Sequence, residues 1–218
     1  MKSKESRRKS YRALQVLTAT LLLAACGGLA APQVASPNIY VLEAGPVIQA
    51  GQVKRDLVLA VSLPRALSGF DTPQMAYVKQ PFELNYFVSS RWADTPARML
   101  QPLIAQAMEQ TESFRAVVQT TGAISADVRL DTELVRLEQD FKTQPSRVQI
   151  TLRVQLIDVR GKRLLAAQQF DDIEIAASED AYGGVTAANR MLQRVLEKLA
   201  EFCVNASAGD LQGGAIRP

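Results

Sequence analysis

The stretch Val148-Gln149-Ile150-Thr151-Leu152-Arg153-Val154-Gln155-Leu156 decides the fold class of this chain. Apolar and polar residues alternate strictly through it, which predicts a β-strand with one face in a core and the other in water. A turn at residues 158–162 follows, and residues 164–175 are expected to pair back as a second strand. Residues 128–137 predict a third strand, in which the alternation changes parity, so we expect a bulge near Leu134–Val135. The centre of the chain is therefore predicted to be an antiparallel meander.

Two segments have helical periodicity instead. Apolar residues recur at helical spacing from Ala181 to Cys203 and predict a long amphipathic helix. The pair Gly183-Gly184 near its start predicts either a close approach of helix and sheet or a delayed helix start. An earlier helix is expected to open at Asp94-Thr95-Pro96, with Asp94 or Thr95 as its cap, and to run to about Gln110. Pro102 inside this segment predicts a kink or a displaced start.

Shorter apolar segments complete the predicted sheet. We expect strands at residues 39–42, 57–63 and 114–119, and a hairpin formed by residues 75–78 and 82–87. Strands, a helix, several antiparallel strands and a second helix then follow one another along the chain. This order predicts an α+β fold: a mixed, mainly antiparallel sheet with two helices packed on one face.

The N-terminus has the pattern of an exported lipoprotein. Residues 2–12 carry six basic residues and one acid, and the apolar run at 13–23 is shorter than the ~20 residues that span a bilayer. These features are typical of a secretory signal. Leu23-Ala24-Ala25-Cys26-Gly27 resembles the bacterial lipobox, in which the cysteine is acylated and becomes the first mature residue. The alternatives are a plain signal peptide with an incidental cysteine, or an uncleaved anchor. Because Gly27 rather than Asp follows, resemblance to sorting in enteric bacteria favours the outer membrane.

This pattern divides the 218 residues into a signal peptide (1–25), a flexible tether (26–37), a folded domain (38–205) and a disordered tail (206–218). The whole chain has a net charge of +3, but residues 1–25 hold six basic residues and one acid. The mature chain keeps 19 basic and 21 acidic residues, a net charge of −2. The charge therefore gives no ground for nucleic-acid binding.

The composition also limits the possible chemistry. The chain has no His and two Cys, which excludes a Ser-His-Asp triad, a Cys-His pair and a His-bearing or Cys₄ zinc site. We expect no enzyme, no catalytic residue and no metal. If Cys26 carries lipid through its sulfur, Cys203 is the other thiol of the mature chain and cannot pair with it. The position of Cys203 on the apolar stripe of the last helix predicts a buried, unreactive side chain.

A few side chains are candidates for contacts. Trp92, at the entrance of the first helix, is a candidate partner contact, with packing of helix on sheet as the alternative. Tyr77 and Tyr86 are further candidates; with Met75, Phe82 and Phe87 they either line a groove for an acyl chain or alternate between core and surface. The acidic run comprises Asp171, Asp172, Glu174, Glu179 and Asp180, and is expected to be a solvated strand end. Scattered surface charge is expected for Arg91, Arg98, Arg153, Arg160, Lys162 and Arg163.

The order and spacing of many short segments resemble the ABC-type transport auxiliary lipoprotein family, which includes partners of MCE-type (paraquat-inducible-type) intermembrane transport systems. The segments are the lipobox cysteine, residues 40–42, the apolar strand ending at Pro64, residues 75–77 and 84–86, the stretch Arg91-Trp92-Ala93-Asp94-Thr95-Pro96-Ala97-Arg98-Met99-Leu100, the strand at 114–118, the hairpin at 158–170 and the closing helix. Together they cover residues 38–205, with Pro102 and Gly183-Gly184 as departures.

The resemblance implies a fold similar to the N-terminal domain of the periplasmic TolB protein. It implies a non-enzymatic auxiliary subunit on the periplasmic face of the outer membrane, docking the MCE-domain or substrate-binding component of an ABC transporter for lipid. Outer-membrane lipid is then a further partner, and a homo-oligomer stays open. Cys26 is expected to carry a diacylglycerol and an N-linked acyl chain such as palmitate, with no other cofactor. The alternative is a stand-alone lipid- or small-molecule-binding lipoprotein, which an apolar cavity of a few hundred Å³ would favour and a filled core would not.

Overall fold

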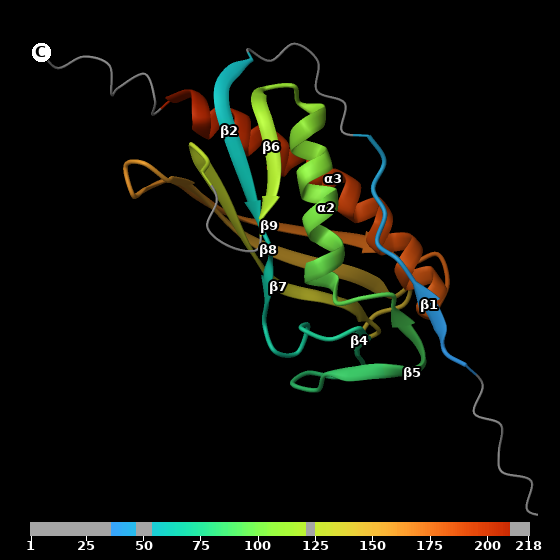
Figure 1. The fold of residues 1–218 in the computed structure, drawn as a ribbon. Coiled ribbons are helices and arrows are strands. Elements are labelled where there is room, and N and C mark those ends of the chain that lie inside the picture. The colour runs from blue at the N-terminus through green and yellow to red at the C-terminus, as the bar shows by residue number, and fades with distance from the viewer. Residues whose placement is uncertain (1–35, 47–53, 121–124, 210–218) are drawn as a thin grey trace, which may run out of the picture. The chain divides into compact units, whose positions relative to one another are not determined.

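The computed structural model describes residues 36–46, 54–120 and 125–209. Its strands are β1 Asn38–Tyr40, β2 Arg55–Ser62, β3 Arg65–Ala66, β4 Gln74–Val78, β5 Asn85–Trp92, β6 Phe114–Thr120, β7 Val128–Asp140, β8 Arg147–Asp158 and β9 Arg163–Ile175, and its helices are α2 Pro96–Gln110 and α3 Ala181–Gly209 (Figure 1). Within this part of the chain, the nine strands form one mixed sheet. The predicted α+β class is confirmed.

Strand β7 is the central strand of the sheet, because other strands pair with both of its edges. On one edge it pairs antiparallel with β8 over nearly its whole length, and β8 pairs in turn with β9. On the other edge three shorter strands, β2, β3 and β4, lie parallel to it one after another. The predicted meander is confirmed. The parallel edge was not predicted, because it joins segments that are separated by more than 60 residues in the sequence.

The predicted bulge lies in the middle of β7. Leu134 pairs with Leu152, whereas Arg136 pairs with Thr151, so Val135 is the extra residue. Without this insertion the period of two would turn Leu137 toward water and Arg136 toward the core. With it, Leu130, Leu134 and Leu137 are all buried, and Arg136 is exposed.

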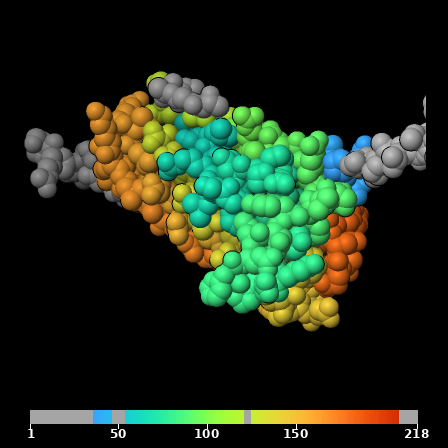
Figure 2. Space-filling model, turned by 90° about the horizontal axis from the view of Figure 1, so that it is seen from below, coloured from blue at the N-terminus to red at the C-terminus, as the bar shows by residue number. Residues whose placement is uncertain are grey.

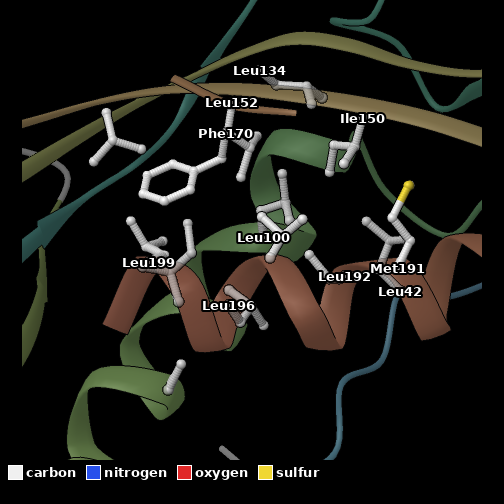
Figure 3. Close-up of a cluster of buried hydrophobic side chains, with 14 of the residues drawn as sticks. Leu42, Leu100, Leu134, Ile150, Leu152, Phe170, Met191, Leu192, Leu196 and Leu199 are labelled. Atoms are coloured by element: carbon white, nitrogen blue, oxygen red, sulfur yellow. The ribbon is translucent and has the colours of Figure 1, made fainter. Parts of the chain in front are cut away.

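The core fills the space between the sheet and the two described helices. Leu134 of β7, Leu152 of β8 and Phe170 of β9 face Leu196 and Leu199 of α3 (Figure 3). Leu100 of α2 lies in the same cluster, so both helices cover the same face of the sheet. Burial of a leucine side chain stabilises a fold by roughly 1.5–3 kcal/mol, and many of these side chains are fully buried. The other face carries the polar residues of β7 and β8, as the alternation predicted.

Helix α2 begins where the sequence indicated. Thr95 occupies the N-cap position and Pro96 the first helical position, but the Thr95 side chain makes no capping hydrogen bond. Pro102 does not displace the start: it lies inside the helix, which is 15 residues long in all. Trp92 is the last residue of β5 rather than part of the helix entrance, and it is 5% exposed.

Helix α3 begins where the apolar periodicity predicted and ends later than expected. It begins at Ala181, so Gly183 and Gly184 lie in its first turns and the delayed start is wrong. A Cβ added to Gly184 would lie 2.3 Å from Oε1 of Gln139 on β7, so this glycine allows the close approach of helix and sheet. The helix also continues to Gly209, past the expected boundary at residue 205. Ser207 is buried and donates to the carbonyl of Cys203.

We predict that Gly184→Ala destabilises the protein, although alanine normally favours a helix by roughly 0.5–1 kcal/mol over glycine. Gln139 is 3% exposed and its amide donates to Ser146 Oγ at 2.9 Å, so it cannot move aside freely. We expect a loss of about 1–3 kcal/mol in the free energy of unfolding, measured by urea denaturation. Gln139→Ala removes the obstacle. The double variant should therefore lose less than the sum of the single losses, and strict additivity would contradict the explanation.

Candidate functional site

The hairpin of β4 and β5 presents apolar side chains to solvent. It projects from the body of the protein at the lower edge of the view in Figure 2. In the loop between the two strands Phe82 is fully exposed and Leu84 is partly exposed, and farther along β5 Val88 is 99% exposed. We call these three residues the hairpin tip. Exposed apolar patches of this kind mark interaction sites more often than chance would place them.

The backbone at the hairpin tip supports the same conclusion. Phe82 has φ 67°, in the left-handed region that bulky residues rarely adopt. Such a conformation costs on the order of 1–3 kcal/mol and tends to occur at functional sites. Hydrogen bonds next to Phe82 stabilise this backbone conformation, because the Glu83 carboxylate accepts from the side chains of Gln80 and Asn85. These bonds hold the pKa of Glu83 below its ordinary value.

An aromatic cluster lies beside the tip and joins the hairpin to the end of β7. The ring centroids of Tyr77 and Phe87 are 4.8 Å apart, and Phe141 packs edge-on against Tyr77 at 5.8 Å. Phe141 directly follows β7, and its backbone N–H donates to the Val78 carbonyl at 2.8 Å. These contacts fix the hairpin to the sheet.

The cluster borders an open hollow of about 380 Å³. Tyr77, Tyr86, Phe87, Val88 and Phe141 line it, together with Lys79, Gln144 and Glu179. The Lys79 ammonium lies 5.4 Å from the centre of the Tyr77 ring, within the range of a cation–π contact. We call this feature the hairpin hollow.

The structure separates the three candidate contact residues. Tyr77 and Tyr86 lie together in the hairpin hollow. The Tyr86 hydroxyl also donates to the Gly69 carbonyl at 2.9 Å, which ties the hairpin to the preceding loop. Trp92 belongs to the core and offers a partner almost no surface. Val88, Lys79 and Phe141 were missed. They lie in or after three different strands, β5, β4 and β7, and only the assembled sheet brings them to one hollow.

The acidic run is in part a solvated strand end, as expected: Asp171, near the end of β9, and Glu179 and Asp180, beyond it, are exposed. Asp172 and Glu174 are half-buried instead and are paired with α3. Asp172 on β9 accepts hydrogen bonds from Arg194 at 2.9 Å and Lys198 at 3.1 Å, both on α3. Glu174 pairs with Arg190 at 2.9 Å and Arg194 at 2.8 Å. Burial alone would raise the pKa of Asp172, but the hydrogen bonds from Arg194 and Lys198 outweigh it and hold the pKa below the ordinary value.

The remaining acids and the scattered basic residues are also engaged. Asp171 accepts from Thr151 Oγ1 at 2.6 Å, Glu179 from the Ser146 N–H at 2.8 Å, and Asp180 from the Gly183 N–H at the start of α3. Of the scattered basic residues, Arg98, Arg153, Arg160 and Arg163 each form an ion pair with a different carboxylate. In the described ranges no group of acids and cysteines is arranged to hold a metal ion.

The two cysteines stand differently. Cys26 lies outside the described residues, so its acylation stays a prediction. Cys203 is fully buried, and burial raises the pKa of its thiol far above the ordinary value. A thiol with so little thiolate is a poor nucleophile.

The comparisons with known proteins identify the family. The model of the ABC-type transport auxiliary lipoprotein component matches residues 40–200. The chain belongs to this family, as the resemblance in the sequence implied, and is thus an auxiliary lipoprotein of ABC-type transport. None of the helices in the described part of the chain has an apolar run long enough to cross a membrane.

Solved structures share the fold. Protein XCC0632 from Xanthomonas campestris matches with a TM-score of 0.74 and 22% identity, covering 80% of this chain and 99% of its own. The crystal structure of an uncharacterised protein matches with a TM-score of 0.61 and 12% identity, covering 77% and 98%. At these identities the likeness concerns the fold alone. No curated protein matches the sequence.

We predict that Asp172→Asn lowers the free energy of unfolding by about 1–3 kcal/mol at neutral pH, the range for lost charged hydrogen bonds. Because the folded-state pKa of Asp172 is lowered, its contribution is complete above the ordinary aspartate pKa of about 3.9. It is lost as the pH falls below that value through the folded-state pKa. Urea denaturation of both proteins from pH 7 downward should show the gap closing.

A matched control for this prediction is Asp56→Asn. Asp56 pairs with Arg115 at 2.9 Å, but its side chain is 84% exposed. Exposed pairs of this kind contribute less than ~1 kcal/mol. A similar loss in both variants, or a gap that does not depend on pH, would contradict the role given to Asp172.

Proposed function

We propose that this protein is an outer-membrane-anchored periplasmic lipoprotein that serves as an auxiliary subunit of an ABC/MCE-type envelope transport system for lipid. It docks the MCE-domain or substrate-binding component of that system through the hairpin tip. The anchor is the diacylglycerol and N-linked acyl chain on Cys26. Family membership supports the transport role, and the full exposure of Phe82 on an ordered hairpin carries the docking role.

The hairpin tip leaves apolar surface in contact with water in the isolated protein. Phe82 and Val88 expose their apolar surface to water and do not belong to the buried core. A partner that covers them removes this surface from water at no cost in rearrangement, because the aromatic cluster already holds the hairpin in place. Aromatic side chains are enriched at the centres of protein interfaces for this reason.

The alternative of a stand-alone carrier with an enclosed ligand has less support. Between the sheet and α3, a gap lined by Met75, Trp92, Gln139 and Gly184 measures only about 20 Å³. Such a space holds about one water molecule. This gap is too small for a lipid, and the larger hollows in the described residues, the hairpin hollow and one between β9 and the end of α3, are open to solvent.

We predict that Phe82→Ser and Val88→Ser together weaken docking without loss of stability. Pull-down of the full protein from membranes should recover the MCE-domain or substrate-binding component about tenfold less than wild type, the factor for a loss of ~1.4 kcal/mol. Ile173→Ser is the control, since this aliphatic residue is 50% exposed on β9. Equal recovery by all variants, or a wild-type preparation without ABC or MCE components, would contradict the proposal.

We also predict that the anchor depends on Cys26 alone. Radioactive palmitate should label the wild-type protein and the Cys203→Ser variant equally, because Cys203 is fully buried. The Cys26→Ser variant should carry no label and should leave the membrane fraction. Gly27→Asp should keep the label and move the protein to the inner membrane. Label on Cys26→Ser, or mass spectrometry showing an unmodified Cys26 in the native protein, would overturn the anchor.

A further inference from the structure

The hairpin hollow combines an apolar floor with one basic side chain, that of Lys79. The rings of Tyr77, Phe87 and Phe141 pack against one another and line the hollow. Its volume of about 380 Å³ falls within the ~300–1,000 Å³ of small-molecule sites. It is therefore large enough for one acyl chain but small for a lipid with two.

The charged side chains around the hollow differ in how far other groups of the protein already occupy them. Lys79 contacts the Tyr77 ring and forms no ion pair within the described residues, and its positive charge helps to lower the pKa of Glu83. Glu179, the acid that lines the same hollow, already accepts the Ser146 N–H at 2.8 Å. Glu83 is likewise occupied by Gln80 and Asn85. The charge open to a ligand is thus the Lys79 ammonium.

We propose that the hairpin hollow binds a single-chain amphiphile with an anionic head group. The acyl chain lies on Tyr77, Phe87 and Phe141, and the head group meets Lys79. An acyl chain gains contact with these rings and needs no hydrogen-bond partner from them, so its chemistry matches an apolar floor. The role of this site rests on the proposed function, because the lipid would be held beside the surface where the transporter component docks.

The chain supplies its own reporter for this site. Trp92 is its single tryptophan. It lines the small gap behind the hollow, and Phe87 lines both spaces. A heavy-atom quencher bound in the hollow therefore comes close to Trp92. A quencher that is only dissolved in the surrounding bilayer is not brought close to Trp92 in this way.

The test uses the full acylated protein in phosphatidylcholine vesicles, titrated with 9,10-dibromostearate while Trp92 fluorescence is recorded. We expect saturable quenching. Lys79→Gln should weaken binding about tenfold, as expected for the loss of one charged hydrogen bond, and Lys79→Arg should restore it. Lys142→Gln is the matched control, because Lys142 carries the same charge nearby but is paired with Asp140 at 3.3 Å and does not line the hollow.

A second arm uses a dibrominated lysophosphatidylethanolamine and distinguishes the two sources of such a ligand. Lys79-dependent quenching by either probe supports the proposal and identifies a free fatty acid or a lysophospholipid as the ligand. Quenching that does not saturate, or that is unchanged in Lys79→Gln, would overturn the proposal. So would a hollow that binds neither lipid but binds a peptide of the docking component. The measurement needs no partner protein, so its failure is distinct from a failure of the pull-down with Phe82→Ser and Val88→Ser.

Discussion

The two-sided pairing of β7 is the constraint on which the rest of the structure depends. This strand holds β8 along one edge and β2, β3 and β4 along the other, so every layer of the fold takes its position from it. Its bulge at Val135 keeps both halves directed at the helices. A β-strand reverses its faces with a shift of one residue, so the bulge decides whether Leu137 and Gln139 reach the core. Gln139 in turn fixes how closely α3 can approach at Gly184.

The candidate site lies where β7 ends. β4 pairs with the last three residues of β7, and Phe141 follows at once, so the aromatic cluster is built from two segments that only the sheet brings together. The cluster stiffens a hairpin whose apolar tip stays exposed. Rigid presentation of apolar surface lowers the entropy cost of binding. The helices thus pack on the β7–β8–β9 layer, while the hairpin tip stays uncovered and available to a partner.

Charge serves the fold more than the site in this protein. Arg190, Arg194 and Lys198 follow one face of α3 and hold the acids of β9 across a sequence separation of 16 to 26 residues. Local reasoning could not find these pairs, since neither the strand nor the helix shows its partner in its own sequence. Lys79 is different, because it contacts the Tyr77 ring at the edge of the hairpin hollow and forms no ion pair in the described part of the chain.

The sequence by itself determined the α+β class, the meander, the bulge, the start of α2 and the membership of the family, because periodicity and the order of local signals depend on neighbouring residues alone. Only the tertiary structure decided that Trp92 is buried, that Val88 is exposed, that Gly184 meets Gln139 and that Asp172 is paired. Each of these depends on contact between segments far apart in the chain. Burial is a property of the assembled layers, and the same alternation in β5 gives a core residue where a helix covers it and a surface residue where the strand extends beyond that helix.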